Sequence, residues 1–375
     1  MAMTWRDLSL PNREEVWRQL RGLRVSPPGA AASDRGRRET LQSALEQAQQ
    51  LMDAAESAGY ATRPLQLFYA LSQGGRAIAA ASPRLPASIQ VPDRDDRSRM
   101  KTQDLPWKLG GHGVKATNTS QGRIAKVRVH AEWTGLLPGV AVALGAECLK
   151  ADEKISVGEL WPLLPESHKV PLDEASQHAA LSFEGVSEPL HGVGSIRVDQ
   201  FKTVAFYEAL LGYVPGTVRR ECGDDQAKLS AFLDHYPSLA GYIFPNPGGG
   251  SIGWGGSDGS GTYSHLNVYW PYPNAASVEW GKQAHQLKAT RYRGAGDWWV
   301  FPKVGSMAGS LHPLLAWWTV LFALSMMARY EPNNWARMIQ IDSSVEASAI
   351  EHILDQALDV VPALLLDAIQ VVGGT

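Results

Sequence analysis

Histidines and arginines are the residues of this 375-residue chain whose types and spacing suit acid-base chemistry. His112 lies in the stretch Gly110-Gly111-His112-Gly113, where an imidazole can exchange protons near neutral pH. Arg123 and His130 lie seven residues apart, and His130 is a second candidate general acid or base. An arginine beside either histidine would stabilise an anionic transition state. We therefore take His112, His130 and Arg123 as the candidate catalytic residues, although a lone surface histidine most often has no such role.

A second set of residues is proposed to bind RNA, DNA or a nucleotide. Cationic side chains recognise phosphates, and the C-terminus of a helix favours a cation such as Arg329. Trp335 can cover the Arg329 guanidinium, a structural arrangement that needs no ligand. The candidate binding residues are Arg76, Lys108, His312, Arg329, Tyr330 and Trp335.

Common catalytic motifs are absent or out of context. Gly248-x-Gly250-x-x-Gly253 has the letters of a dinucleotide fingerprint, but the sequence predicts no strand before it and no helix after it. The serines of the same glycine-rich stretch give chance matches to a nucleophile elbow. The ten histidines show no metal-ligand spacing, and there is no P-loop. We expect no metal, no cofactor, and a loop or hairpin at Gly248–Gly261.

Composition and charge narrow the class of protein. A hydrophobic content of 44% with 19% charged residues is typical of a globular chain and excludes collagen and wholesale disorder. Residues 1–150 carry 21 Lys and Arg against 14 Asp and Glu, a net charge of +7, which leaves -10 for the remainder. We therefore expect the basic residues 1–150 to contact either polyanions or the acidic remainder of the chain. Two cysteines and a charged N-terminus without a signal peptide favour the cytoplasm.

Helices must position the N-terminal candidates. The segment 39–58 is rich in Ala, Leu, Gln and Glu, and Ser33 and Asp34 precede it as caps. A second helix is predicted from Pro64 to Ser82. Two glycines in its middle, Gly74-Gly75, favour the close approach of a neighbouring helix.

Strands and loops are predicted next along the chain. Three prolines and a mixed-charge run predict an exposed loop over 83–100, and alternation over 127–132 predicts a strand. Short helices are expected at 156–164 and 200–211. The aromatic segment 263–270 is strand-like.

The last third is predicted to be helical. The segment 311–328 carries no formally charged residue and reaches the lower limit for a membrane span, but its length and polar residues favour a buried core helix. A final amphipathic helix is expected over 345–369. The predicted fold is α+β, predominantly helical, with a small antiparallel β insertion and regions at 1–150, 151–240 and 241–375.

Several of these segments together resemble the YaaC-like family of bacterial proteins. The resemblance rests on Phe68-Tyr69-Ala70-Leu71 with Gly75-Arg76-Ala77-Ile78, on His112-Gly113, and above all on Leu324-Ser325-Met326-Met327-Ala328-Arg329-Tyr330-x-Pro332-x-x-Trp335. It covers the chain from about Trp17 to the C-terminus. The resemblance to this family implies no particular biochemical activity.

The helix that contains Arg76, with the His112 loop after it, is also similar to the second helix of HEPN domains, which are helical bundles of nucleotide-associated proteins and defence ribonucleases. The resemblance implies a metal-independent ribonuclease where an Arg and a His lie four to six residues apart on one helix. Here the nearest spacing is Arg123 to His130, on a predicted strand.

The leading hypothesis is a cytoplasmic binding protein for RNA, DNA or a nucleotide in bacterial stress or phage defence. It rests on the resemblance and on the basic N-terminal part. The alternatives are a HEPN-type ribonuclease and a homodimeric structural protein. We expect no membrane partner.

Overall fold

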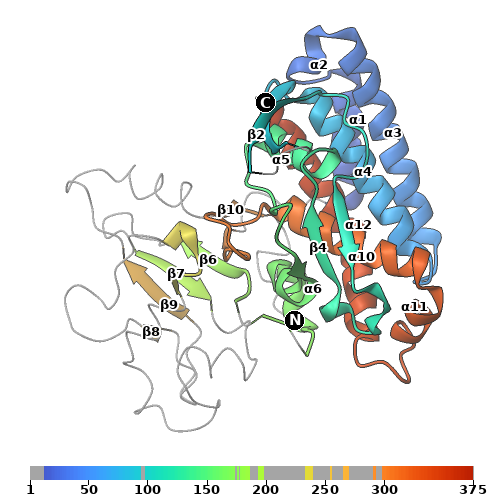
Figure 1. The fold of residues 1–375 in the computed structure, drawn as a ribbon, viewed down its shortest axis with the longest axis vertical. Coiled ribbons are helices and arrows are strands. Elements are labelled where there is room, and N and C mark those ends of the chain that lie inside the picture. The colour runs from blue at the N-terminus through green and yellow to red at the C-terminus, as the bar shows by residue number, and fades with distance from the viewer. Residues whose placement is uncertain are drawn as a thin grey trace.

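Helices dominate the protein in the computed structural model, which describes residues 12–93, 98–173, 175–176, 178–185, 193–197, 233–239, 254–255, 265–269, 290–292 and 298–374. Long helices from the two ends of the chain pack side by side, and small antiparallel sheets lie beside them (Figure 1). This confirms the predicted α+β, mainly helical fold. The helices are α1 (Arg13–Val25), α2 (Ala30–Ser33), α3 (Arg35–Ser57), α4 (Arg63–Ala81), α5 (Leu136–Leu144), α6 (Val157–Leu160), α10 (Pro313–Tyr330), α11 (Pro332–Met338) and α12 (Ala347–Gly373).

The predicted helix boundaries agree closely with those of the structure. Asp34 caps α3 by accepting a hydrogen bond from the Arg37 backbone N–H at 2.8 Å. α4 has Pro64 in its first turn, where proline costs no hydrogen bond, and it ends before Pro83. α12 is longer than predicted and contains Pro362.

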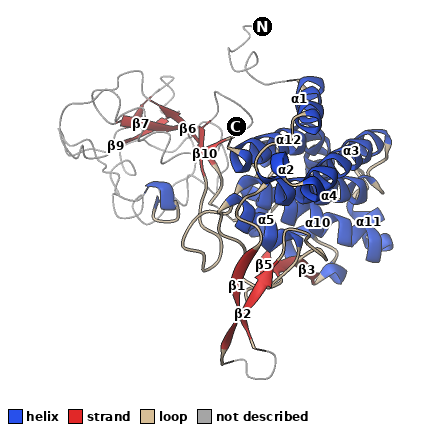
Figure 2. Ribbon diagram, turned by 90° about the horizontal axis from the view of Figure 1, so that it is seen from above, coloured by secondary structure: helices blue, strands red, loops and turns tan. Residues whose placement is uncertain are grey.

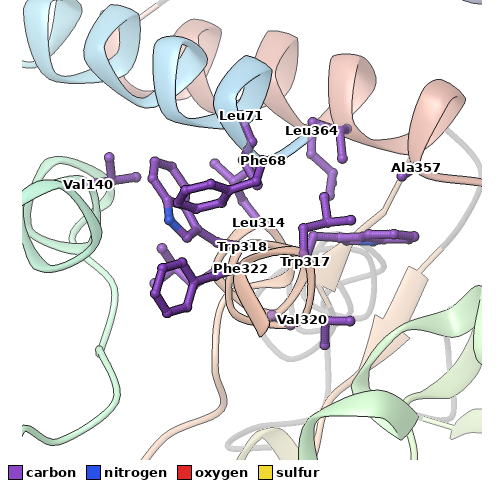
Figure 3. Close-up of a cluster of buried hydrophobic side chains, with 14 of the residues drawn as sticks. Phe68, Leu71, Val140, Leu314, Trp317, Trp318, Val320, Phe322, Ala357 and Leu364 are labelled. Carbon is purple, nitrogen blue, oxygen red and sulfur yellow. The ribbon is translucent and has the colours of Figure 1, made fainter. Parts of the chain in front are cut away.

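α10 is the central helix of the core. Before Arg329 in its last turn it carries no charged residue, and this part is buried nearly all round, as expected for a helix that is apolar on every face. Trp317 and Trp318 are fully buried between α10 and its neighbours α4, α5 and α12 (Figure 3). The Trp317 indole N–H donates to the Tyr292 hydroxyl at 3.0 Å, which satisfies its one polar atom.

The two glycines in the middle of α4 allow this close packing. A Cβ added at Gly75 would lie 2.4 Å from the Trp318 ring, and one added at Gly74 would lie 2.4 Å from the Leu365 side chain of α12. The predicted reason for the glycines, close approach of neighbouring helices, is confirmed.

Antiparallel sheets flank the bundle. β1 (Ala87–Pro92) and β2 (Met100–Leu105) form a hairpin that projects from the helices (Figure 2). A second sheet has the order β3-β4-β5, with β3 at Val114–Thr117, β4 at Arg128–Ala131 and β5 at Ile155–Ser156. The largest sheet has the order β10-β11-β6-β7-β9-β8, with strands at Thr290–Arg291, Trp298–Val300, Leu181–Gly185, Val193–Arg197, His265–Tyr269 and Trp254–Gly255.

One predicted element is wrong, and the others are confirmed where they are described. The expected loop over 83–100 contains β1 and the start of β2, because Ile89 and Val91 alternate with polar residues and this pattern outweighs the flanking prolines. The strands near 127–132 and 263–270 are confirmed. The helix predicted at 156–164 is α6 followed by a 3-10 turn. The helix predicted at 200–211 and most of Gly248–Gly261 lie outside the described residues.

Basic residues of the first helices meet acidic residues of α12. The Arg13 guanidinium lies 2.6 Å from an Asp359 carboxylate oxygen, and Arg63 pairs with Asp355. The Tyr60 hydroxyl donates to Asp355 at 3.1 Å. Part of the charge asymmetry of the sequence is therefore satisfied within the molecule. The three predicted regions stay a prediction, and the core includes residues from both ends of the chain.

Among the described residues, one helix is long and apolar enough to cross a membrane by length and composition, and it is α12 rather than α10. Most of its apolar window is buried inside the protein. Core helices pass the same test, so this is weak evidence for a membrane span.

Candidate functional site

The loop that carries His112 is held by the N-terminus of α5. The backbone N–H groups of Leu136 and Leu137 donate to the carbonyls of Gly111 and His112 at 3.2 and 3.0 Å. The first N–H groups of a helix have no partner within the helix, so the loop satisfies donors that would otherwise be unpaired. Gly113 has a φ of +70°, and a Cβ there would lie 2.6 Å from Pro138. Glycine is therefore required where this loop turns.

Three aromatic rings surround the His112 imidazole. The ring centroid of Phe68 lies 5.1 Å away, and those of Tyr69 and Phe322 both lie 6.2 Å away. Burial among these rings lowers the His112 pKa, and the positive charges of Arg76 and Arg329 lower it further, while Glu132 opposes the shift. His112 is therefore neutral at pH 7, and two of the predicted binding residues lie near it.

The two arginines reach His112 from neighbouring helices. Arg329, in the last turn of α10, donates to the Tyr69 hydroxyl of α4 at 3.2 Å. Arg76 lies two turns after Tyr69 on α4 and donates at 3.4 Å to the Leu109 carbonyl, just before the His112 loop. The packing of α4 against α10 thus brings residues 76, 112 and 329 to one place. We call the group Tyr69, Arg76, His112 and Arg329 the His112 site.

The His112 site has unused hydrogen-bonding and charge capacity. Within the described part of the chain, neither Arg76 nor Arg329 has a carboxylate within 4.0 Å, and the His112 ring makes no hydrogen bond. An arginine offers five N–H donors, and the described residues accept a hydrogen bond from only one of them at each of these two arginines. Two cations without an acidic partner among the described residues, beside a neutral imidazole, are an arrangement whose chemistry suits an anion.

The other predicted binding residues lie outside this site or at its edge. Lys108 is exposed and its Nζ lies 5.1 Å from the Trp107 ring. Tyr330, rather than Trp335, lies over the Arg329 guanidinium, at 5.0 Å. Trp335 is buried and donates to the Ala61 carbonyl at 3.1 Å.

His312 lies at the opposite end of α10 from Arg329 and caps that helix. Its Nδ1 accepts a hydrogen bond from the Leu314 backbone N–H at 3.2 Å. Burial lowers the His312 pKa to about 4. The structure therefore brings His112 and Arg329 together but places His312 and Trp335 in the interior.

Arg123 and His130 face different cavities. Arg123 pairs with Asp173 at 3.2 Å and lines a cavity with Arg337 and Glu346. His130 lies on β4 opposite Lys115 and lines a cavity beneath the β1–β2 hairpin. His112 is not among the lining residues of either cavity. The pair Arg123 and His130 therefore does not form one site.

Sequence reasoning missed Tyr69, Phe322 and Glu132. A spacing of seven residues, two helical turns, separates Tyr69 from Arg76 and Phe322 from Arg329, so each pair lies on one helix face. That spacing is visible in the sequence, but the pairing of the two faces depends on how α4 packs against α10.

Fold and site together define a mainly helical α+β protein with a basic surface site around a histidine. A family model described as YaaC-like Protein matches residues 26–369, so the chain belongs to the YaaC-like family, as its sequence predicted. Comparison with curated proteins and with solved structures finds no match. The resemblance to HEPN domains stays a prediction.

Proposed function

We propose that the His112 site binds a phosphate group of a nucleic acid or a nucleotide. The observation that carries the proposal is the pair Arg76 and Arg329, two cations that meet at a neutral histidine with no carboxylate partner among the described residues. Arginine matches the geometry of phosphate oxygens, and a neutral imidazole adds a further donor. Bacterial stress or phage defence is the setting we propose, on the resemblance to HEPN domains alone.

The electrostatics of the site favour an anion over a cation. The carboxylate whose charge opposes the lowering of the His112 pKa, that of Glu132, is paired with Lys115 at 2.8 Å. The aromatic rings around His112 exclude water from one side, which strengthens the attraction between the arginines and a phosphate.

The test is salt-dependent binding by the intact protein. Fluorescence anisotropy with labelled single-stranded RNA and DNA, and calorimetry with nucleotides, measure affinity from 50 to 300 mM salt. Arg76→Gln and Arg329→Gln should each weaken binding about tenfold, because each removes a charged hydrogen bond. The double variant should lower the slope of log K against log salt for a single strand by about 1.4.

Arg35→Gln is the matched control. Arg35 lies on α3 with 90% of its side chain exposed, so this variant makes the same change in net charge away from the site. We expect no change in affinity. Absence of binding to every nucleic acid and nucleotide, or equal losses in the control, would overturn the proposal.

A specific observation also favours the ribonuclease alternative with His112 as the general base. The lowered pKa keeps His112 unprotonated at pH 7, which a base requires, and the two arginines would stabilise a pentavalent phosphate. Cleavage of RNA that His112→Asn abolishes, with binding retained, would support this version. Binding without cleavage by the native protein would exclude it. The homodimeric alternative stays a prediction that a mass measurement in solution tests.

A further inference from the structure

A cavity of about 600 Å³ lies beneath the β1–β2 hairpin, next to the His112 site. This volume is within the range of small-molecule sites. Its lining includes Thr102 and Gln103 of the hairpin together with Lys115, His130, Trp133 and Thr134. The function proposed above makes no use of it.

The β3–β4 pair supplies the floor of this cavity. Lys115 and His130 are register partners in the antiparallel ladder, so their side chains share one face of the sheet. Val114 and Val129 alternate with them and belong to the core. The strand pattern therefore turns a polar face toward the cavity and an apolar face toward the bundle.

Trp133 offers an aromatic surface at the edge of the cavity. It lies two residues after the last residue of β4, and 43% of it is exposed, although tryptophan is highly buried on average. An exposed indole ring is a platform on which a planar ring can stack.

His130 has a hydrogen-bonding atom without a partner. Its Nδ1 is buried and makes no hydrogen bond among the described residues. Burial first, and then the charges of Lys154 and Lys115, lower the His130 pKa, while Glu132 opposes the shift. A neutral imidazole has one donor and one acceptor, which suits an uncharged polar ring better than an anion. An unpaired buried nitrogen costs free energy, which a small shift of the imidazole toward a ligand atom would recover.

The cavity and the His112 site are adjacent. The Glu132 backbone N–H donates to the Gly113 carbonyl at 2.8 Å, and the Glu132 charge acts on the pKa of both His112 and His130. Two strand residues, about 7 Å, separate Gly113 from Lys115. A single ligand can therefore occupy both.

We propose that this cavity binds a nucleobase, stacked on Trp133 and hydrogen-bonded to His130 and Gln103, of the ligand whose phosphate lies at the His112 site. The proposal rests on the function proposed above and names its ligand class: an unpaired nucleotide, free or within a single strand. A duplex is excluded, because its bases are stacked and paired and cannot enter a cavity without flipping out.

Calorimetry with the full chain tests the base directly. The probes are AMP, GMP, CMP and UMP, compared with ribose 5-phosphate, which has the phosphate and sugar without a base. The native protein should bind at least one nucleotide about tenfold more tightly than ribose 5-phosphate, and Trp133→Ala should remove that difference. Gln103→Ala, a second exposed position, should reduce it. Met100→Ala, an exposed apolar residue of the same hairpin outside the lining, should leave it unchanged.

The outcomes separate this proposal from the one on which it rests. Equal affinity for nucleotides and ribose 5-phosphate, with both weakened about tenfold in Arg76→Gln, overturns the base site and leaves the phosphate site standing. No binding of any probe, including oligonucleotides, overturns both. Anisotropy with single strands of one, two, four and eight nucleotides identifies the source: affinity that stays constant with length indicates a free nucleotide, and affinity that rises indicates a single strand. Tighter binding of a duplex than of either strand also overturns the base site.

Discussion

Arginine and histidine are used in opposite ways in two regions of the α4–α10 pair. These helices are antiparallel, since Tyr69 meets Arg329 while Gly75 meets Trp318. The C-terminus of α4 and the N-terminus of α10 form what we call the closed end, where the buried Arg37 and the half-buried His312 have partners inside the protein. At the His112 site the same residue types keep unused donors. The difference teaches that residue type alone does not identify a structural cation. A structural cation has its hydrogen bonds paired within the protein, whereas the cations that we propose to bind a ligand keep unpaired donors.

Substitution of Arg37 should give the largest effect on stability. Its guanidinium is 7% exposed and donates to carbonyls at the end of α4, including that of Ser82 at 2.9 Å, as well as to the Leu85 carbonyl. Arg37→Met leaves these acceptors unpaired, so the free energy of unfolding should fall by about 3 kcal/mol in urea titrations. Affinity at the His112 site should not change. A fall in the free energy of unfolding below about 1 kcal/mol would show that water replaces the Arg37 guanidinium. The carbonyls at the closed end would then be accessible to solvent.

A substitution at Gly75 tests the packing of α4 against α10, between the closed end and the His112 site. A Cβ at this position would lie 2.4 Å from the buried Trp318 ring, so Gly75→Ala should cost about 2 kcal/mol by overpacking. Gly22→Ala is the control, because Gly22 lies on α1 with open space around it. There alanine should stabilise by about 0.5 kcal/mol, since it favours a helix. Thermal unfolding of both variants measures the change in stability, which should be a loss for Gly75→Ala and a gain for Gly22→Ala. Equal changes in the two variants would contradict the packing argument.

His312 makes the closed end sensitive to acid. Its pKa is about 4 in the folded protein and near 6.5 when unfolded, so the unfolded chain binds the proton first as pH falls. Stability is therefore lost on the acid side, with a share for His312 of about 2 kcal/mol between pH 7 and 5. His312→Asn keeps a capping oxygen without a titrating group, and it should flatten the plot of unfolding free energy against pH over this range. An unchanged slope would assign the effect to His168 and His178, whose pKa values are also about 4.

Local patterns were sufficient to predict most helices. The caps and prolines of α3, α4 and α10, and the alternation of β4, are signals carried by neighbouring residues. The β1–β2 hairpin was missed because prolines and a charge run mask a short alternation. Such signals depend on neighbouring residues and not on tertiary contacts, so they can be read from the sequence.

The site was only half predictable, because it depends on contacts between distant segments. The sequence predicts His112, Arg76 and Arg329 as candidate residues one by one. No local sequence pattern indicates that residues 112 and 329 lie close together in space. Nor does the sequence show that Trp335 is buried and that His312 is half-buried, since both lie close to the same apolar helix as Arg329. Packing between segments that are distant in the sequence decides which of the predicted site residues keep their side chains accessible to a ligand.

The smallest effect on stability should come from the His112 site itself, and it gives the sharpest test of the comparison. Arg329 is exposed and donates one hydrogen bond, and Arg76 donates one long bond to a carbonyl. Without buried acceptors that depend on them, the double variant Arg76→Gln/Arg329→Gln should change the free energy of unfolding by less than about 0.5 kcal/mol. The same variant should weaken phosphate binding strongly, so that stability and affinity move independently. If it instead unfolds as readily as Arg37→Met, these arginines hold the fold. The unused N–H donors of Arg76 and Arg329 would then simply be hydrogen-bonded to water. The closed end and the His112 site would not differ in the role of their arginines.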